Sequence, residues 1–127
     1  MHNILLFEPD QEKVPHSVFL LKLADIHCTV AKTAEEILNW VNACRMMVTH
    51  FDLILLNSLQ GSGLDTILLT ELCEQATVPV VCVQRQEVPP SLFLIHNVIT
   101  CHPDYLLDCL QEQFNSLANQ LTKEKVQ

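Results

Sequence analysis

The chain has 127 residues, 49% of them hydrophobic and only two of them glycine, which fits one domain with its own core and excludes a disordered segment. Seven lysines and arginines against fifteen aspartates and glutamates leave a net charge of −8, and we expect no direct nucleic-acid binding because such a surface repels phosphate backbones. The apolar runs are far shorter than the roughly 20 residues that cross a bilayer, and no leader-like segment precedes them, so we expect a cytoplasmic protein without membrane contact.

Five short apolar runs, rich in β-branched residues, alternate with amphipathic segments of helical length. This alternation is typical of a parallel sheet with helices on both faces, so we predict a three-layer, doubly wound α/β domain. The predicted strands are Asn3 to Phe7, His27 to Ala31, Phe51 to Leu56, Pro79 to Val83 and Asn97 to Cys101.

Two helices are predicted in the first half of the chain, and the second has a recognisable start. The first covers about Gln11 to Ala24, and Pro15 suits its first turn. The second opens with a capping box, in which Thr33 accepts a hydrogen bond from the Glu36 amide while the Glu36 side chain reaches back. Their inward residues are predicted to be Val14, Val18 and Leu21 in the first, and Ile37, Leu38, Val41, Cys44 and Val48 in the second.

The later helices are less regular. The third follows Gly61-Ser62-Gly63, and Gln86 to Pro90 cannot be regular helix, which leaves residues 91–96 for a shortened fourth helix. The last begins at Pro103, and we expect one domain over 1–121 with a polar tail over 122–127. The inward residues are predicted to be Leu64, Ile67, Leu68 and Leu72 in the third helix, and Leu106, Leu110, Phe114, Leu117 and Leu121 in the last.

Six cysteines are present, but none forms a Cys-x-x-Cys pair. They lie mostly in apolar stretches, where a thiol behaves as a small hydrophobe, so we expect buried, reduced thiols rather than a metal or redox site. We do not expect Cys101 and His102 to act as a nucleophile and its base, because neighbouring strand residues point to opposite faces.

Four segments carry a resemblance to a known family through their order and spacing. Ile4 to Asp10 matches a first strand and the acidic turn after it, and Phe51 to Asn57 matches a third strand up to a phospho-acceptor position. Val78 to Gln84 is similar to a fourth strand with a Pro-Val entry, and Cys101 to Pro103 falls where the family carries Lys-Pro. The chain thus resembles the receiver domains of two-component response regulators, in particular the single-domain kind, over nearly its whole length.

The resemblance implies a flavodoxin-like, five-stranded parallel sheet of order 2-1-3-4-5, with the active edge at the carboxyl ends of the strands. Phosphorylation at that edge requires a carboxylate nucleophile, an acidic cluster that holds Mg²⁺, and a hydroxyl and an ammonium that bind the new charge.

The residues at these positions depart from the family pattern. Asn57 stands at the acceptor position, and its neutral amide cannot replace a carboxylate nucleophile. Pro9 has no side-chain oxygen, which leaves Asp10 as a displaced second acid beside Glu8. The degenerate phosphorylation pocket therefore consists of Glu8, Pro9, Asp10, Asn57, Gln84 and His102.

We expect a phosphorylation-independent signalling module, a pseudo-receiver, that is not an enzyme and uses no cofactor or metal. Its expected partner is a signalling protein such as a histidine kinase or another regulator, bound by the face formed by residues 91–110. A homodimer through the same face is the other arrangement that we consider. The residues named for this face are Leu92, Phe93, Leu94, Ile95, Ile99 and Tyr105.

Three alternatives stay open at this point. The first is a small-ligand sensor that uses a neutral pocket around Asn57 and Gln84. The second is an active phospho-receiver with a different acceptor, Asp52 or Asp65. The third concerns Glu8 and Asp10, which either hold a divalent cation or serve as turn and helix-capping residues.

Overall fold

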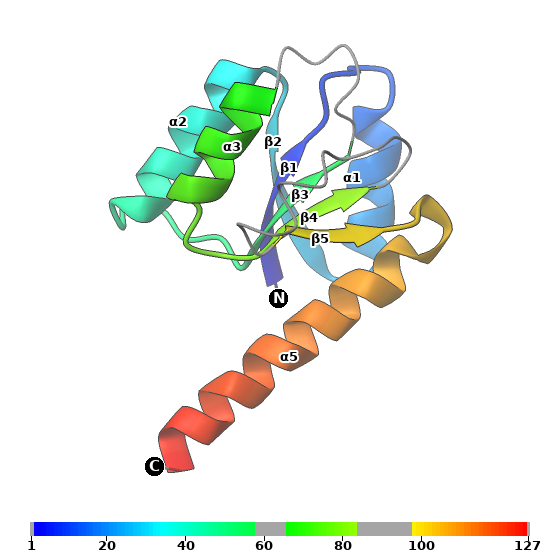
Figure 1. Ribbon diagram of the computed structural model, residues 1–127. Coiled ribbons are helices and arrows are strands. Elements are labelled where there is room, and N and C mark those ends of the chain that lie inside the picture. The colour runs from blue at the N-terminus through cyan, green and yellow to red at the C-terminus, as the bar shows by residue number, and fades with distance from the viewer. Residues whose placement is uncertain (1, 58–65, 84–97, 127) are drawn as a thin grey trace.

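Five parallel strands form a single sheet in the computed structural model, in the order β2-β1-β3-β4-β5 (Figure 1). The structure describes residues 2–57, 66–83 and 98–126, without the side chains of residues 66 and 117–126. The predicted sheet and its strand order are confirmed. The strands are β1 (His2–Phe7), β2 (Ile26–Ala31), β3 (Leu53–Leu56), β4 (Val80–Val83) and β5 (Val98–Cys101).

The register of the central strands brings distant parts of the chain to one edge. Phe7, the last residue of β1, pairs with Ala31 on one side and with Leu56 on the other. Every residue of β3 and β4 is buried, as expected for parallel strands that are covered on both faces. The residues that follow β1 and β3 in sequence therefore emerge side by side.

Four helices and one short 3-10 turn surround the sheet in the described part of the chain. In Figure 1, α2 and α3 cover one face of the sheet and α1 and α5 cover the other. The shortened fourth helix that the sequence predicts falls in 84–97, outside the described residues. The helices are α1 (Val14–Leu23), α2 (Ala34–Arg45), α3 (Thr66–Gln75) and α5 (Leu106–Val126), and η1 (Pro103–Tyr105) precedes α5.

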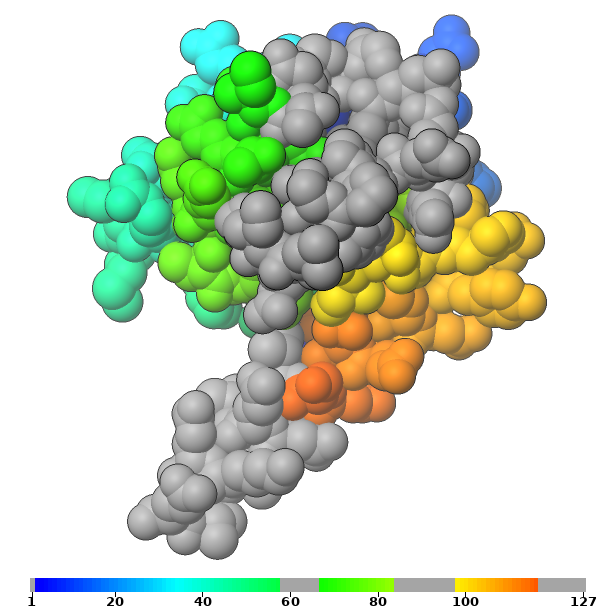
Figure 2. Space-filling view, viewed as in Figure 1, coloured from blue at the N-terminus to red at the C-terminus, as the bar shows by residue number. Residues whose placement is uncertain are grey.

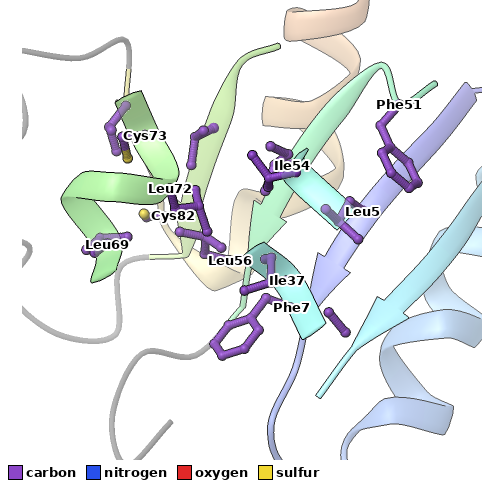
Figure 3. Packing of buried hydrophobic residues seen from close by; sticks show 14 residues of the cluster. Leu5, Phe7, Ile37, Phe51, Ile54, Leu56, Leu69, Leu72, Cys73 and Cys82 are labelled. Carbon is purple, nitrogen blue, oxygen red and sulfur yellow. The ribbon is translucent and has the colours of Figure 1, made fainter. Parts of the chain in front are cut away.

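Alternate residues of the strands pack into two separate hydrophobic clusters. Leu5, Ile54 and Leu56 face α2 and α3 (Figure 3). Leu6 and Leu55, one position along in β1 and β3, face α1 and α5. This two-sided burial follows from the period of two in a strand. The sheet therefore contributes side chains to both hydrophobic cores.

Helix α2 begins with the predicted cap. Thr33 Oγ1 accepts the Glu36 backbone N–H at 3.1 Å, whereas the Glu36 carboxylate accepts the N–H of Lys32 at 2.8 Å, not that of Thr33. The hydrogen bond of the Glu36 side chain thus involves the N–H one residue before the one that the capping box predicts. Two donors at the helix entry are nevertheless satisfied, which is what a cap accomplishes.

Two predicted inward residues are wrong. Val48 is 80% exposed, because α2 ends at Arg45 and Met47 turns the chain with a left-handed φ of 63°. Ile67 is 78% exposed while Leu69 is buried, because Leu69, Leu72 and Cys73 lie on the side of α3 that meets the core, with Leu68 packed against them. The last helix runs from Leu106 to Val126, into the predicted polar tail; the division into a domain and a tail stays a prediction.

Candidate functional site

The candidate site lies where β1 and β3 end, at the carboxyl edge of the sheet. The Asn57 N–H donates to the Phe7 carbonyl at 3.1 Å, and the Glu8 N–H donates to the Ala31 carbonyl at 3.0 Å. These two bonds extend the ladders of the sheet by one residue each. They fix the backbones of Glu8 and Asn57 next to each other, so Asn57 lies at the tip of the central β3, where the sequence predicted it.

Glu8 and Asn57 form a buried polar pair. Glu8 is 0% exposed and Asn57 is 5% exposed, and the Asn57 Nδ2 donates to the Glu8 Oε2. The other carboxylate oxygen, Oε1, accepts the backbone N–H of Asp10 at 3.1 Å. A buried carboxylate is tolerated only with such partners, and here both of its oxygens are bonded within the protein.

Ser17 is a third member of this site that the sequence did not single out. Its Oγ lies 3.4 Å from the Asn57 Nδ2, which brings α1 into contact with the end of β3. The only local signal was a hydroxyl beside Val18 and Leu21 on the inward side of α1. Because Ser17 and Asn57 are 40 residues apart, that signal becomes meaningful only after the chain has folded.

Asp10 serves the turn that leads into α1. Its Oδ1 accepts the backbone N–H of Glu12 at 3.0 Å, and its Oδ2 lies 3.9 Å from the Lys13 Nζ. Pro9 separates it from Glu8. These contacts match the turn and capping reading of the two carboxylates better than the cation-binding one.

His102 does not contact the Glu8–Asn57 pair in the described hydrogen bonds. His102 is exposed, and its Nδ1 accepts the backbone N–H of Asp104 at 3.2 Å, which caps η1. This is the helix-start role that the residue before Pro103 suggests. Gln84 lies outside the described residues.

The Mg²⁺ that phosphorylation chemistry requires does not fit the described residues of this edge. The acceptor position carries a neutral amide, Pro9 offers no oxygen, and both oxygens of Glu8 already accept protein donors. Among the side chains that the structure describes, no three of His, Cys, Asp or Glu gather as metal ligands do.

A cavity of about 530 Å³ opens beside Asn57, between α1 and the start of α5. Leu6, Leu21, Leu55 and Val83 belong to both its lining and the core on that face of the sheet. The pocket is not neutral, as the ligand-sensor alternative assumed, because two carboxylates also line it. The polar residues of the lining are His16, Ser17, Asn57, Asp104 and Asp108.

The cysteines lie away from the polar pair. All six are free, and Cys73, Cys82 and Cys101 are buried. Burial raises the pKa of the Cys28 and Cys73 thiols to about 11 and the pKa of Cys82 and Cys101 to about 12. A smaller rise comes from neighbours, Glu74 for Cys73 and Cys109 for Cys101. Such thiols are poor nucleophiles at neutral pH, in line with a packing role.

The predicted interaction face is described only in part. Tyr105 is 65% exposed, but Ile99 is half-buried and packs against the core between the sheet and α5. Leu92, Phe93, Leu94 and Ile95 lie outside the described residues. Figure 2 shows β5, η1 and the start of α5 (yellow to orange) as exposed surface on this side of the molecule.

Helices of the described residues are all too short or too polar to serve as transmembrane segments. No family model matches the sequence, and a search of curated proteins found no match.

Solved structures do match over nearly the whole chain. A two-component response regulator from Clostridium difficile has a TM-score of 0.68 at 17% identity, over 95% of this chain and 98% of its own. The response regulator TrrA from Thermotoga maritima, in complex with Mg²⁺-BeF, has a TM-score of 0.59 at 18% identity, over 92% of this chain and 99% of its own. A complex of the histidine kinase ThkA with TrrA gives 0.64 at 16% identity, over 89% of this chain and 98% of the matched chain. The fold of this chain is therefore the fold of receiver domains.

Proposed function

We propose that this chain, which has the fold of response-regulator receiver domains, is a signalling module that binds a protein partner without being phosphorylated. The proposal places it in a two-component pathway and in the cytoplasm. It is not an enzyme in this proposal, because the position that would carry out phosphoryl transfer lacks a nucleophile.

The observation that supports the proposal most is the buried pair of Asn57 and Glu8. The Asn57 Nδ2 donates to the Glu8 carboxylate. A neutral amide thus occupies the position where a phosphorylated receiver would need a carboxylate, and it is hydrogen-bonded to the neighbouring Glu8. A carboxamide has no anionic oxygen to attack phosphorus. The strand end can thus keep its shape with no added phosphoryl group or cation.

Incubation of the full chain with acetyl phosphate and Mg²⁺ tests this proposal. We expect the intact mass to stay unchanged, and a receiver domain that keeps the acceptor aspartate should gain a phosphoryl group in the same mixture. A hydroxylamine-sensitive phosphoryl adduct on this chain would overturn the proposal, because that lability is the mark of an acyl phosphate.

An alternative acceptor at Asp52 has little support from the geometry. Asp52 precedes β3 and so lies at the opposite end of that strand from Asn57. Its Oδ2 accepts the Asn3 backbone N–H at 2.8 Å, and its Oδ1 lies 3.2 Å from the His50 Nε2. Asp65 lies outside the described residues, so the Asp65→Asn variant is the one to compare if an adduct is found.

The proposed partner is a signalling protein, either a histidine kinase or another regulator, bound by the face over residues 91–110. The structure of ThkA with TrrA is one instance of a kinase bound to a protein of this fold. On this chain, the exposed ring of Tyr105 supports the choice of face. A second copy of the chain is the other occupant that we propose for it, and sedimentation that shows only monomer at high concentration would remove the homodimer.

A further inference from the structure

The cavity between α1 and α5 has the size of a small-molecule site. Its volume is about 530 Å³, within the range of roughly 300–1,000 Å³ that is usual for ligand pockets. The floor is apolar, since Leu6, Leu55 and Val83 from three adjacent strands line it. Such a floor can bury the hydrocarbon part of a ligand.

The charge of the lining selects among ligands. Asp104 in η1 and Asp108 in the first turn of α5 both line the cavity, and among the described residues of the lining there is no lysine or arginine. Over the described residues, neither carboxylate pairs with a lysine or arginine; Asp104 Oδ2 lies 3.5 Å from the His102 Nδ1. The chain as a whole carries a net charge of −8. Anions such as phosphates are therefore disfavoured, and cations are favoured.

Three further polar residues contribute to the lining. Ser17 and Asn57, which contact each other beside Glu8, line the cavity, and His16 joins them from α1. A few polar groups around an apolar floor are what orients a ligand in a small-molecule site.

We propose that this cavity binds a small organic cation, an apolar body that carries a primary amine, with the amine held by Asp104 and Asp108. This inference does not depend on the proposed partner binding or on the absence of phosphorylation. If this inference and the proposed function both hold, the ligand would bind between α1 and α5 of a protein that signals by binding a partner.

Three probes of one shape and different charge test this inference on the full chain. They are phenethylamine, phenethyl alcohol and hydrocinnamate, which share a phenyl ring and a short linker. We expect phenethylamine to raise the melting temperature and to bind in calorimetry, the alcohol to bind more weakly, and hydrocinnamate to show no binding. The amine should also lose affinity as salt concentration rises, because the carboxylates are exposed.

Two variants and one control locate the binding. Removing both charges in D104N/D108N should weaken phenethylamine binding about tenfold, to the level of the alcohol. Leu107 lines the cavity and is 41% exposed. The large ring introduced by L107W should fill part of the cavity and block all the probes that bind. E112Q removes an exposed charge from the same helix outside the lining and should leave binding unchanged.

Each other outcome contradicts the inference. Equal binding of hydrocinnamate and phenethylamine would remove the preference for a cation, and unchanged amine binding in D104N/D108N would remove the role of the carboxylates. No binding by any of the three probes to the folded chain would remove the site. None of these results bears on the acetyl phosphate experiment, so the two proposals fail separately.

Discussion

Asn57 is the residue on which the proposed function depends most. A carboxylate at the same position would face the buried Glu8 carboxylate, and two adjacent buried charges of one sign repel each other. The amide replaces that repulsion by a hydrogen bond to a charged acceptor, one of the stronger bonds in proteins. The position is thus built for a neutral side chain as long as Glu8 stays an acid.

The Asn57→Asp variant measures how far the site depends on this pairing. We expect a loss of about 2 kcal/mol in the free energy of unfolding by urea, because the donor to Glu8 disappears and a second charge is buried. The matched control is E8Q/N57D, which exchanges the two groups and restores one amide–carboxylate contact. It should recover most of the loss, and a double variant no more stable than N57D would show that the contact contributes little.

The buried thiols give a second prediction for single residues. The pKa of Cys82 and Cys101 rises from 9.0 to about 12 through burial, so the unfolded chain releases these protons at a lower pH than the folded chain. The stability that this difference contributes is complete below pH 9.0 and is lost as the pH rises toward 12.

Two measurements check the behaviour of the thiols. The melting temperature should fall steadily above pH 9.0. Iodoacetamide near neutral pH should label Cys82 and Cys101 far more slowly in the folded chain than in urea. Equal labelling rates in the two conditions would contradict the burial of these thiols.

At the scale of elements, α3 shows how packing corrects a pattern read from sequence. Apolar residues occur at positions 67, 68, 69 and 72, so the inward side of the helix cannot be assigned from its own period. Packing on the sheet determines the inward side, because Leu69 and Leu72 pack in the core that contains Leu56 and Cys82.

A pair of alanine variants in α3 tests this orientation. Leu69→Ala should cost about 2–5 kcal/mol, because it leaves a cavity in the core. Ile67→Ala should change stability by less than about 0.5 kcal/mol, because its side chain lies in solvent. Chemical unfolding of both variants gives the comparison, and a larger effect for Ile67 would mean that α3 is rotated about its axis.

The whole molecule is organised by a sheet that serves two cores. Ile54 belongs to the cluster under α2 and α3, and Leu55 belongs to the cluster under α1 and α5. Since neighbouring residues of β3 are anchored in opposite layers, neither layer can separate while β3 stays paired. Folding of the described part is therefore expected to be cooperative.

Cooperativity is checked by placing one cavity in each layer. Ile54→Ala and Leu55→Ala should each cost about 2–5 kcal/mol, and each should shift one single transition that fluorescence and circular dichroism report together. A variant that melts in two separate steps would show that the layers are independent.

The sequence by itself determined the elements and their order. Short apolar runs predicted the parallel strands, Thr33 predicted the start of α2, and the motif ending at Asn57 predicted the strand tip on which it lies. These features are encoded within a few neighbouring residues, by the periods of two and 3.6 and by local hydrogen bonds. Even there, the choice between Lys32 and Thr33 as partner of Glu36 needed the folded helix entry.

Only the tertiary structure decided which residues Asn57 contacts at the end of β3. Glu8 and Asn57 are 49 residues apart, and their bond exists because the register of β1 and β3 places them side by side. The contact of Ser17 with Asn57 and the cavity between α1 and α5 depend in the same way on how the helices pack on the sheet. Contacts between distant residues arise from register and packing, which no local pattern specifies.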